Sequence, residues 1–108
     1  MTFVNSIQKW FGVEFGGSLY LPDGWFGRPY DNQHILTAIS ETEDSLIITL
    51  DHKIVLCFEG LRAVDATSRE LVLGPFTKLR FEWEDAKGGQ RVTKEYESGV
   101  AKIVAAPG

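Results

Sequence analysis

The two histidines are the residues of this chain most suited to proton transfer, and each has an acid nearby in the sequence. His34 follows Asp31 by three residues, and His52 directly follows Asp51. A histidine beside a carboxylate acts as a general base, or holds a ligand, when the fold brings a nucleophile or a polar substrate to it. The local pattern supplies neither. We therefore interpret His52 as a solvated turn residue and His34 as a surface polar group at the start of a strand.

The remaining reactive side chains form no recognisable catalytic or metal-binding pattern. Cys57 lies in an apolar run, so we expect a buried, unreactive thiol. One thiol and two separated histidines give no metal-ligand spacing, and the glycine doublets 16–17 and 88–89 do not join a strand to a helix as phosphate loops do. The acidic clusters 41–44 and 82–85 suit a solvated face. These residues predict a protein without metal or cofactor and favour a non-catalytic function.

Residues 21–34 form the most distinctive segment, because large side chains alternate there with residues that forbid regular structure. Prolines at positions 22 and 29 remove backbone donors, and glycines at positions 24 and 27 admit positive φ. Flexible linkers lack such aromatics and prolines, so we expect an ordered loop of the kind that often carries function. Its candidate contact residues for a ligand or partner are Trp25, Phe26, Arg28, Tyr30, Asp31 and His34.

Two interpretations of this loop stay open. Its aromatic side chains could close one end of a β domain, in which case the loop serves stability. They could also form a contact surface, since Trp, Tyr and Arg dominate the energetics of protein interfaces. Our functional hypothesis is a small non-catalytic cytoplasmic binding or protein-interaction domain, whose partner is another protein or a second copy of the chain. The alternative is a small-ligand carrier or enzyme with a pocket next to His34 and Asp31.

Length, charge and hydropathy bound the class of protein. The 108 residues suit a single domain, 1–108, with an N-terminal segment (1–18), the aromatic segment (19–34) and a β region (34–105). A formal net charge of −4 argues against nucleic acid as a partner, because proteins that bind it carry a basic surface. Neither a signal peptide nor an apolar run of about 20 residues is evident, so we expect a cytoplasmic protein without a membrane partner.

Beyond the aromatic segment, hydrophobic residues alternate with a period of two, which is typical of β-strands. The predicted strands are 34–40, 45–50, 53–59, 61–65, 70–73, 78–84, 91–97 and 100–105. We therefore expect an all-β, antiparallel domain of about six to eight short strands, arranged as a barrel, a roll or a small sandwich. At the N-terminus, Ile7, Trp10 and Phe11 fall on one face of a short predicted helix over residues 5–11.

The charges of the last three predicted strands give a register. If residues 85–90 close a hairpin, opposite charges face one another on one side and mostly apolar side chains on the other. The first set pairs Glu84 with Arg91, Arg80 with Glu95 and Lys78 with Glu97, and the second pairs Trp83 with Val92, Phe81 with Lys94 and Leu79 with Tyr96. A further turn at Ser98-Gly99 places Lys102 opposite Glu95. The sequence therefore predicts a C-terminal three-stranded meander.

Overall fold

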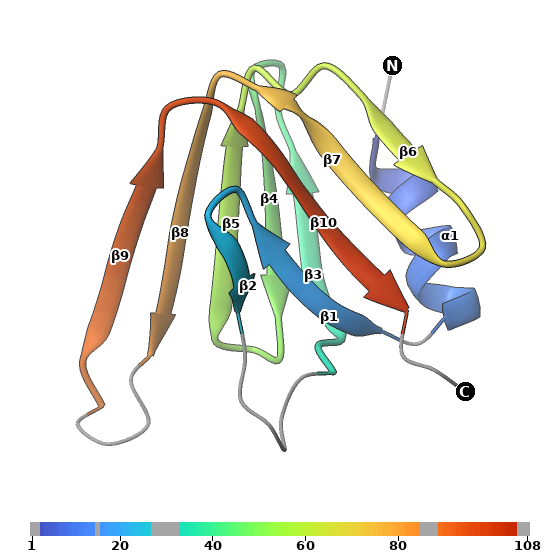
Figure 1. The fold of residues 1–108 in the computed structure, drawn as a ribbon, viewed down its shortest axis with the longest axis horizontal. Helices are drawn as coiled ribbons and strands as arrows, with labels where there is room; N and C mark the ends of the chain where they lie inside the picture. Colours follow the sequence, from blue (N-terminus) through green and yellow to red (C-terminus); the bar gives the residue numbers. More distant parts are fainter. Residues whose placement is uncertain (1–2, 15, 27–32, 85–88, 106–108) are drawn as a thin grey trace.

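The computed structural model describes residues 3–14, 16–26, 33–84 and 89–105. Within these ranges the chain forms one helix and ten strands, arranged as two antiparallel five-stranded sheets (Figure 1). The elements are α1 (Val4–Glu14), β1 (Gly17–Leu21), β2 (Gly24–Phe26), β3 (Leu36–Glu41), β4 (Ser45–Leu50), β5 (Ile54–Glu59), β6 (Val64–Ala66), β7 (Glu70–Phe76), β8 (Lys78–Glu84), β9 (Arg91–Tyr96) and β10 (Gly99–Ala105). The prediction of a small all-β domain with a short N-terminal helix is confirmed.

The two sheets are separate layers. The first sheet has the strand order β2-β1-β10-β7-β6, and the second has the order β3-β4-β5-β8-β9. The chain crosses from one sheet to the other after β2, β5, β7 and β9. Each sheet keeps its own edge strands, so the architecture is a two-layer arrangement and not a closed barrel.

The number of strands is larger than predicted, because residues 17–26 form two strands that the sequence analysis placed in the N-terminal and aromatic segments. β1 and β2 pair as a hairpin, with Leu19 opposite Phe26 and Leu21 opposite Gly24. In β1, buried residues alternate with half-buried ones as in any strand with one covered face. Glycines and a proline flank this alternation, and they led to the prediction of a loop. The first part of that loop is instead a hairpin.

The β8–β9 hairpin has the register that the charges predicted. Glu84 lies opposite Arg91, Arg80 opposite Glu95 and Phe81 opposite Lys94. The charged groups do not all pair straight across: the described ion pairs of this face join Lys78 to Glu95 (3.7 Å), Arg80 to Glu82 (3.9 Å) and Arg91 to Glu82 (3.5 Å). These side chains are exposed, apart from the half-buried Glu82, so the pairs stabilise the register by only a few tenths of a kcal/mol each.

The predicted three-stranded meander is wrong, because β10 does not pair with β9. It crosses to the first sheet and lies between β1 and β7, with Lys102 opposite Tyr20 and Val72. Gly99, with a φ of 138°, and a bulge between Gly99 and Ala101 redirect the chain at this point. In the first sheet β10 hydrogen-bonds to a strand on each side, whereas at the end of a meander its outer backbone groups would lack a strand partner.

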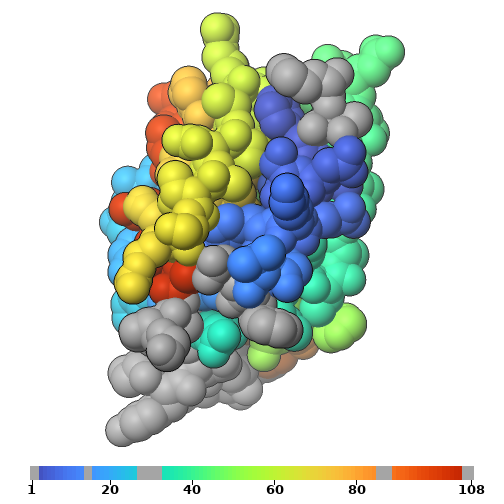
Figure 2. Space-filling view, turned by 90° about the vertical axis from the view of Figure 1, so that its right-hand side faces the viewer, coloured from blue at the N-terminus to red at the C-terminus, as the bar shows by residue number. Residues whose placement is uncertain are grey.

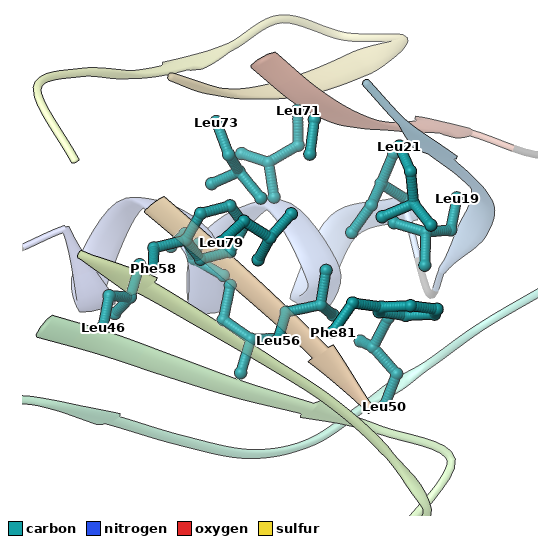
Figure 3. Packing of buried hydrophobic residues seen from close by; sticks show 14 of the residues in the cluster. Leu19, Leu21, Leu46, Leu50, Leu56, Phe58, Leu71, Leu73, Leu79 and Phe81 are labelled. Atoms are coloured by element: carbon teal, nitrogen blue, oxygen red, sulfur yellow. The ribbon is translucent and has the colours of Figure 1, made fainter. Parts of the chain in front are cut away.

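The core lies between the two sheets. Leu19, Leu71 and Leu73 of the first sheet point toward Phe58 and Phe81 of the second (Figure 3). All five side chains are at most 1% exposed. Burial of a Leu or Phe side chain contributes about 1.5–3 kcal/mol, so this interlayer contact is the main source of stability.

One open side of the two-layer structure is covered by α1. The helix lies between β6 on one hand and β3 on the other (Figure 2). Ile7, Trp10 and Phe11 are buried on its inner face, as predicted, and the Trp10 indole donates a hydrogen bond to the carbonyl of Thr67 (2.9 Å). The helix runs past the predicted end at residue 11, since these apolar contacts stabilise it through Gly12.

The other open side, between β2 and β9, is bridged by polar groups. Asp23, in the turn between β1 and β2, accepts hydrogen bonds from Lys94 Nζ (2.8 Å) and Tyr96 Oη (2.9 Å) of β9. We call these three residues the Asp23 bridge. Because they come from different sheets, the bridge connects the edges of both layers.

Candidate functional site

Trp25 and Phe26, neighbours in the predicted contact segment, point to opposite faces of the first sheet. The Trp25 side chain is 45% exposed on the outer face, opposite Tyr20 of β1. Phe26 points into the molecule and packs edge-on against Phe81 (4.8 Å) and Trp83 (5.4 Å between ring centroids). Successive side chains of a strand alternate between faces, so these two aromatics cannot contribute to one surface. Trp25 belongs to a surface and Phe26 to the core.

Trp25 is the end of a row of side chains across the outer face of the first sheet. Tyr20 lies opposite Trp25 on one side and opposite Lys102 on the other. Lys102 Nζ is 5.5 Å from the centre of the Tyr20 ring, within the range of a cation–π interaction. We call Trp25, Tyr20 and Lys102 the aromatic row. Sequence reasoning missed Tyr20 and Lys102; the alternation in residues 17–21 was the signal that could have found Tyr20.

The Asp23 bridge holds the hairpin that presents this row. Hydrogen bonds from Lys94 and then Tyr96 lower the pKa of the Asp23 carboxyl below its ordinary value of 3.8. The same bond to Asp23 raises the pKa of Lys94, and burial followed by that bond raises the pKa of Tyr96. At neutral pH the bridge therefore joins a carboxylate to an ammonium and a neutral phenol. It ties the turn before Trp25 to the second sheet.

His34 is buried, which corrects the prediction of a surface polar group. Its backbone bridges Gly17 in both directions (2.8 and 3.1 Å), and its side chain is 4% exposed. His34 Nδ1 lies 2.7 Å from Asp51 Oδ2, while Asp51 Oδ1 accepts a hydrogen bond from Ile35 N (3.0 Å). The acid beside His34 is therefore Asp51, from the β4–β5 turn. The predicted neighbour, Asp31, lies outside the described residues.

The turn that supplies Asp51 has an uncommon backbone. Asp51 and His52 both have positive φ, 55° and 62°, a conformation that Asp and His tolerate better than most residues. Asp51 N donates to Ile35 O and His52 N to Thr37 Oγ1, so the start of β3 fixes the turn. His52 itself is exposed, and its interpretation as a turn residue is confirmed.

The His34–Asp51 pair leaves one imidazole nitrogen available. An ionised carboxylate only accepts hydrogen bonds, so Nδ1 carries the proton of this contact, and Nε2 of a neutral ring is an acceptor. Nε2 is buried and has no hydrogen-bond partner among the described residues; the Phe26 ring centre is 6.1 Å from that of His34. Nε2 is therefore placed to accept a hydrogen bond. The thiol of Cys57 is no partner for it, because Cys57 lies on the outer face of the second sheet.

Cys57 is half-buried and not fully buried as predicted. It alternates with the buried Leu56 and Phe58, so its side chain points away from the core. Desolvation, and secondarily the charge of Glu59, raises the pKa of the Cys57 thiol. A raised pKa lowers the thiolate fraction at neutral pH. Low reactivity of Cys57 stays a prediction, and the full burial expected for it is wrong.

One group of acidic residues lies around a cavity. A cavity of about 220 Å³ at the end of β3 and β4 farthest from His34 includes Glu41, Glu43, Asp44 and Glu59 in its wall. The Glu41 carboxylate accepts a hydrogen bond from Phe3 N (3.1 Å) and so is part of the contact between α1 and β3. In the described part of the chain, no group of three or more His, Cys, Asp or Glu side chains is placed to hold a metal ion.

The structure thus separates the predicted contact residues. Trp25 is on the outer face, whereas Phe26 and His34 are inside. Arg28, Tyr30 and Asp31 lie outside the described residues.

Among the described helices, none is long and apolar enough to cross a membrane. No protein-family model matches the chain, and neither the curated proteins nor the solved structures include a significant match.

Proposed function

We propose that this chain is a small non-catalytic binding domain of the cytoplasm that contacts another protein through the aromatic row. The observation that carries the proposal is the 45% exposure of Trp25 beside Tyr20 and Lys102. Tryptophan and tyrosine provide large contact areas at low entropic cost and are enriched among the residues that dominate protein interfaces. A tryptophan side chain exposed to this degree contributes little to the stability of the isolated domain.

The way in which the aromatic row is held in the fold also favours a binding function. Tyr20 and Lys102 lie in adjacent central strands, and Trp25 follows a turn held by the Asp23 bridge. A surface on paired strands loses less conformational freedom upon binding than a surface on a loop. The net charge of −4 makes a basic protein the favoured partner, because opposite charge accelerates association.

A small-ligand site next to His34 is the second candidate. It is favoured by the buried Nε2, which lacks a hydrogen-bond partner among the described residues. A ligand with a hydroxyl or amide donor would satisfy this acceptor. Native mass spectrometry of the purified protein tests this candidate: a bound small molecule that is lost in His34→Phe and retained in Trp25→Ala would support it over the contact surface.

Trp25→Ala tests the contact surface. Because the side chain is largely on the outer face, we expect the free energy of unfolding to change by less than about 1 kcal/mol. The proteins that the wild type captures from native lysate, quantified by mass spectrometry, should be lost by Trp25→Ala and by Tyr20→Ala. Ile35→Ala is the matched control, since Ile35 is 47% exposed and lies outside the aromatic row.

Two results would contradict this proposal. If Trp25→Ala captured the same proteins in equal amounts, the aromatic row would not be part of the interface. A loss of several kcal/mol of stability in Trp25→Ala would instead identify Trp25 as a structural residue, as the cap interpretation of the segment expects.

A further inference from the structure

Of the four sheet edges in the described structure, β9 is the one that is both long and open. The edges are β2 and β6 in the first sheet and β3 and β9 in the second. β2 and β6 have three residues each, and α1 packs against both β3 and β6. β9 has six residues and pairs only with β8; Figure 1 shows it at the far margin of the molecule, with no described element beyond it. Its outer backbone groups are a template for another strand.

Charged side chains often protect such edges, but here one of them is tied back. Lys94 lies opposite the buried Phe81, so it points to the inner face of the second sheet. There its ammonium group is bonded to Asp23 (2.8 Å) and lies 5.8 Å from the centre of the Tyr96 ring. The lysine therefore leaves the backbone edge of β9 accessible.

The outer face of β9 has a charge pattern that complements itself. Arg91, Thr93 and Glu95 share this face, with the neutral Thr93 at the centre. If two copies of β9 pair antiparallel about a two-fold axis at Thr93, Arg91 of each copy lies opposite Glu95 of the other. Arg91 is about half exposed, as is Glu95, so both can reach a second chain.

Neighbouring registers fit less well. A two-fold axis at Val92 places Arg91 opposite Thr93 of the second copy and forms no ion pair. An axis at Lys94 places two lysines directly opposite each other, a destabilising arrangement, and reaches beyond the end of β9 for an acidic partner. The Thr93 register opposes Lys94 to the aliphatic Val92 and avoids both problems.

We propose that the β9 edge binds the β9 edge of a second copy of this chain in the Thr93-centred register. The two second sheets, five strands each, then form one continuous ten-stranded sheet. Across the contact between the two copies of β9, positive and negative side chains alternate in the order Arg80 and Glu95 of one copy, then Arg91 and Glu84 of the other. Backbone hydrogen bonds supply affinity, and the charges select the register and the partner. This surface is separate from the aromatic row and does not depend on its function.

Charge reversal tests the register. In Arg91→Glu, two glutamates oppose each other at both ends of the junction, and in Glu95→Arg two arginines do. Each variant alone should therefore have a dimer dissociation constant at least about tenfold higher than the wild type. In an equimolar mixture, each glutamate meets an arginine of the other variant, so heterodimers should form as readily as wild-type homodimers. Sedimentation velocity over a concentration series measures all three states.

The controls separate charge from register. Arg62→Glu and Glu43→Arg change the net charge by the same amounts at exposed positions away from β9, and they should dimerise like the wild type. Circular dichroism verifies that each variant is folded. Trp25→Ala should also keep the dimer, which distinguishes failure of this proposal from failure of the aromatic row.

A cross-link provides a second test that does not depend on the charged variants. Opposed residues of antiparallel strands have Cα atoms about 4.5–5.5 Å apart, a distance that a disulfide spans. In a Cys57→Ser background, Thr93→Cys should oxidise to a covalent dimer. Glu95→Cys should form no covalent dimer, because in this register position 95 lies opposite position 91 of the second copy and not opposite its own counterpart. A wild-type protein that is monomeric at all concentrations, a mixture that fails to associate, or equal cross-linking at both positions would overturn the proposal.

Discussion

The two open sides of this molecule are closed in different ways. On the α1 side, Ile7, Trp10 and Phe11 are at most 7% exposed and fill the space between the edge strands β3 and β6. On the opposite side, Asp23 reaches Lys94 and Tyr96 through exposed hydrogen bonds. The apolar closure stabilises the fold, whereas the polar bridge holds a hairpin in place and leaves both Trp25 and the β9 edge accessible.

The two closures contribute differently to the stability of the fold. Burial of large apolar side chains contributes several kcal/mol, while exposed charged contacts contribute little. The bridged side is held by exposed polar contacts, and both surfaces for which we propose partners, the aromatic row and the β9 edge, lie next to it.

The largest expected effect is on the α1 side. Trp10→Ala removes a side chain that is 5% exposed and its hydrogen bond to Thr67, and it should reduce the free energy of unfolding by about 3–5 kcal/mol. Trp10→Phe keeps the aromatic packing but not the indole donor and should lose much less. Urea denaturation measures both variants. A small loss in Trp10→Ala would mean that α1 is dispensable and that the two sides do not differ as described.

A smaller effect is expected at the bridge. Asp23→Ala removes exposed hydrogen bonds only, so its unfolding midpoint in urea should lie much closer to that of the wild type than the midpoint of Trp10→Ala. Because the bridge is electrostatic, the difference between Asp23→Ala and the wild type should shrink further at high salt. A loss as large as that of Trp10→Ala would contradict the assignment of stability to the α1 side.

The smallest effect is the pH dependence of this difference. The pKa of Asp23 is lower in the folded chain than its ordinary value of 3.8, so the unfolded chain binds the proton more readily. Its stabilising contribution is therefore complete above about pH 5 and is lost as the pH falls through and below 3.8. The midpoints of Asp23→Ala and the wild type should therefore approach each other as the pH falls from about 5 through 3.8 and below. A difference that stays constant as the pH falls below 3.8 would show that the charge of Asp23 is not its basis.

Sequence reasoning succeeded where neighbouring residues determine the structure. The β8–β9 register follows from charges on two adjacent strands, and the face of α1 from apolar spacing. The position of β10 could not be predicted in this way, since hydrogen bonding to β1 and β7 is a long-range choice that local charges do not encode.

The candidate site was predictable only in part. Trp25 was selected by residue type, and the structure places it on the outer face of the first sheet. The partners of His34 and Trp25 were missed, because Asp51 lies 17 residues after His34, and Lys102 reaches the aromatic row from the far end of the chain. Such contacts depend on the order of strands in a sheet and not on spacing in the sequence.

Backbone amide hydrogen exchange in the wild type and Asp23→Ala tests most directly whether the two sides are closed independently. We predict that Asp23→Ala accelerates exchange in β2 and the preceding turn, while the amides of α1 keep their wild-type rates, because local opening of the bridged hairpin leaves the helix packed. Equal acceleration in α1 and β2 would contradict the account, since it would show that the bridge and the helix stabilise the fold as one unit.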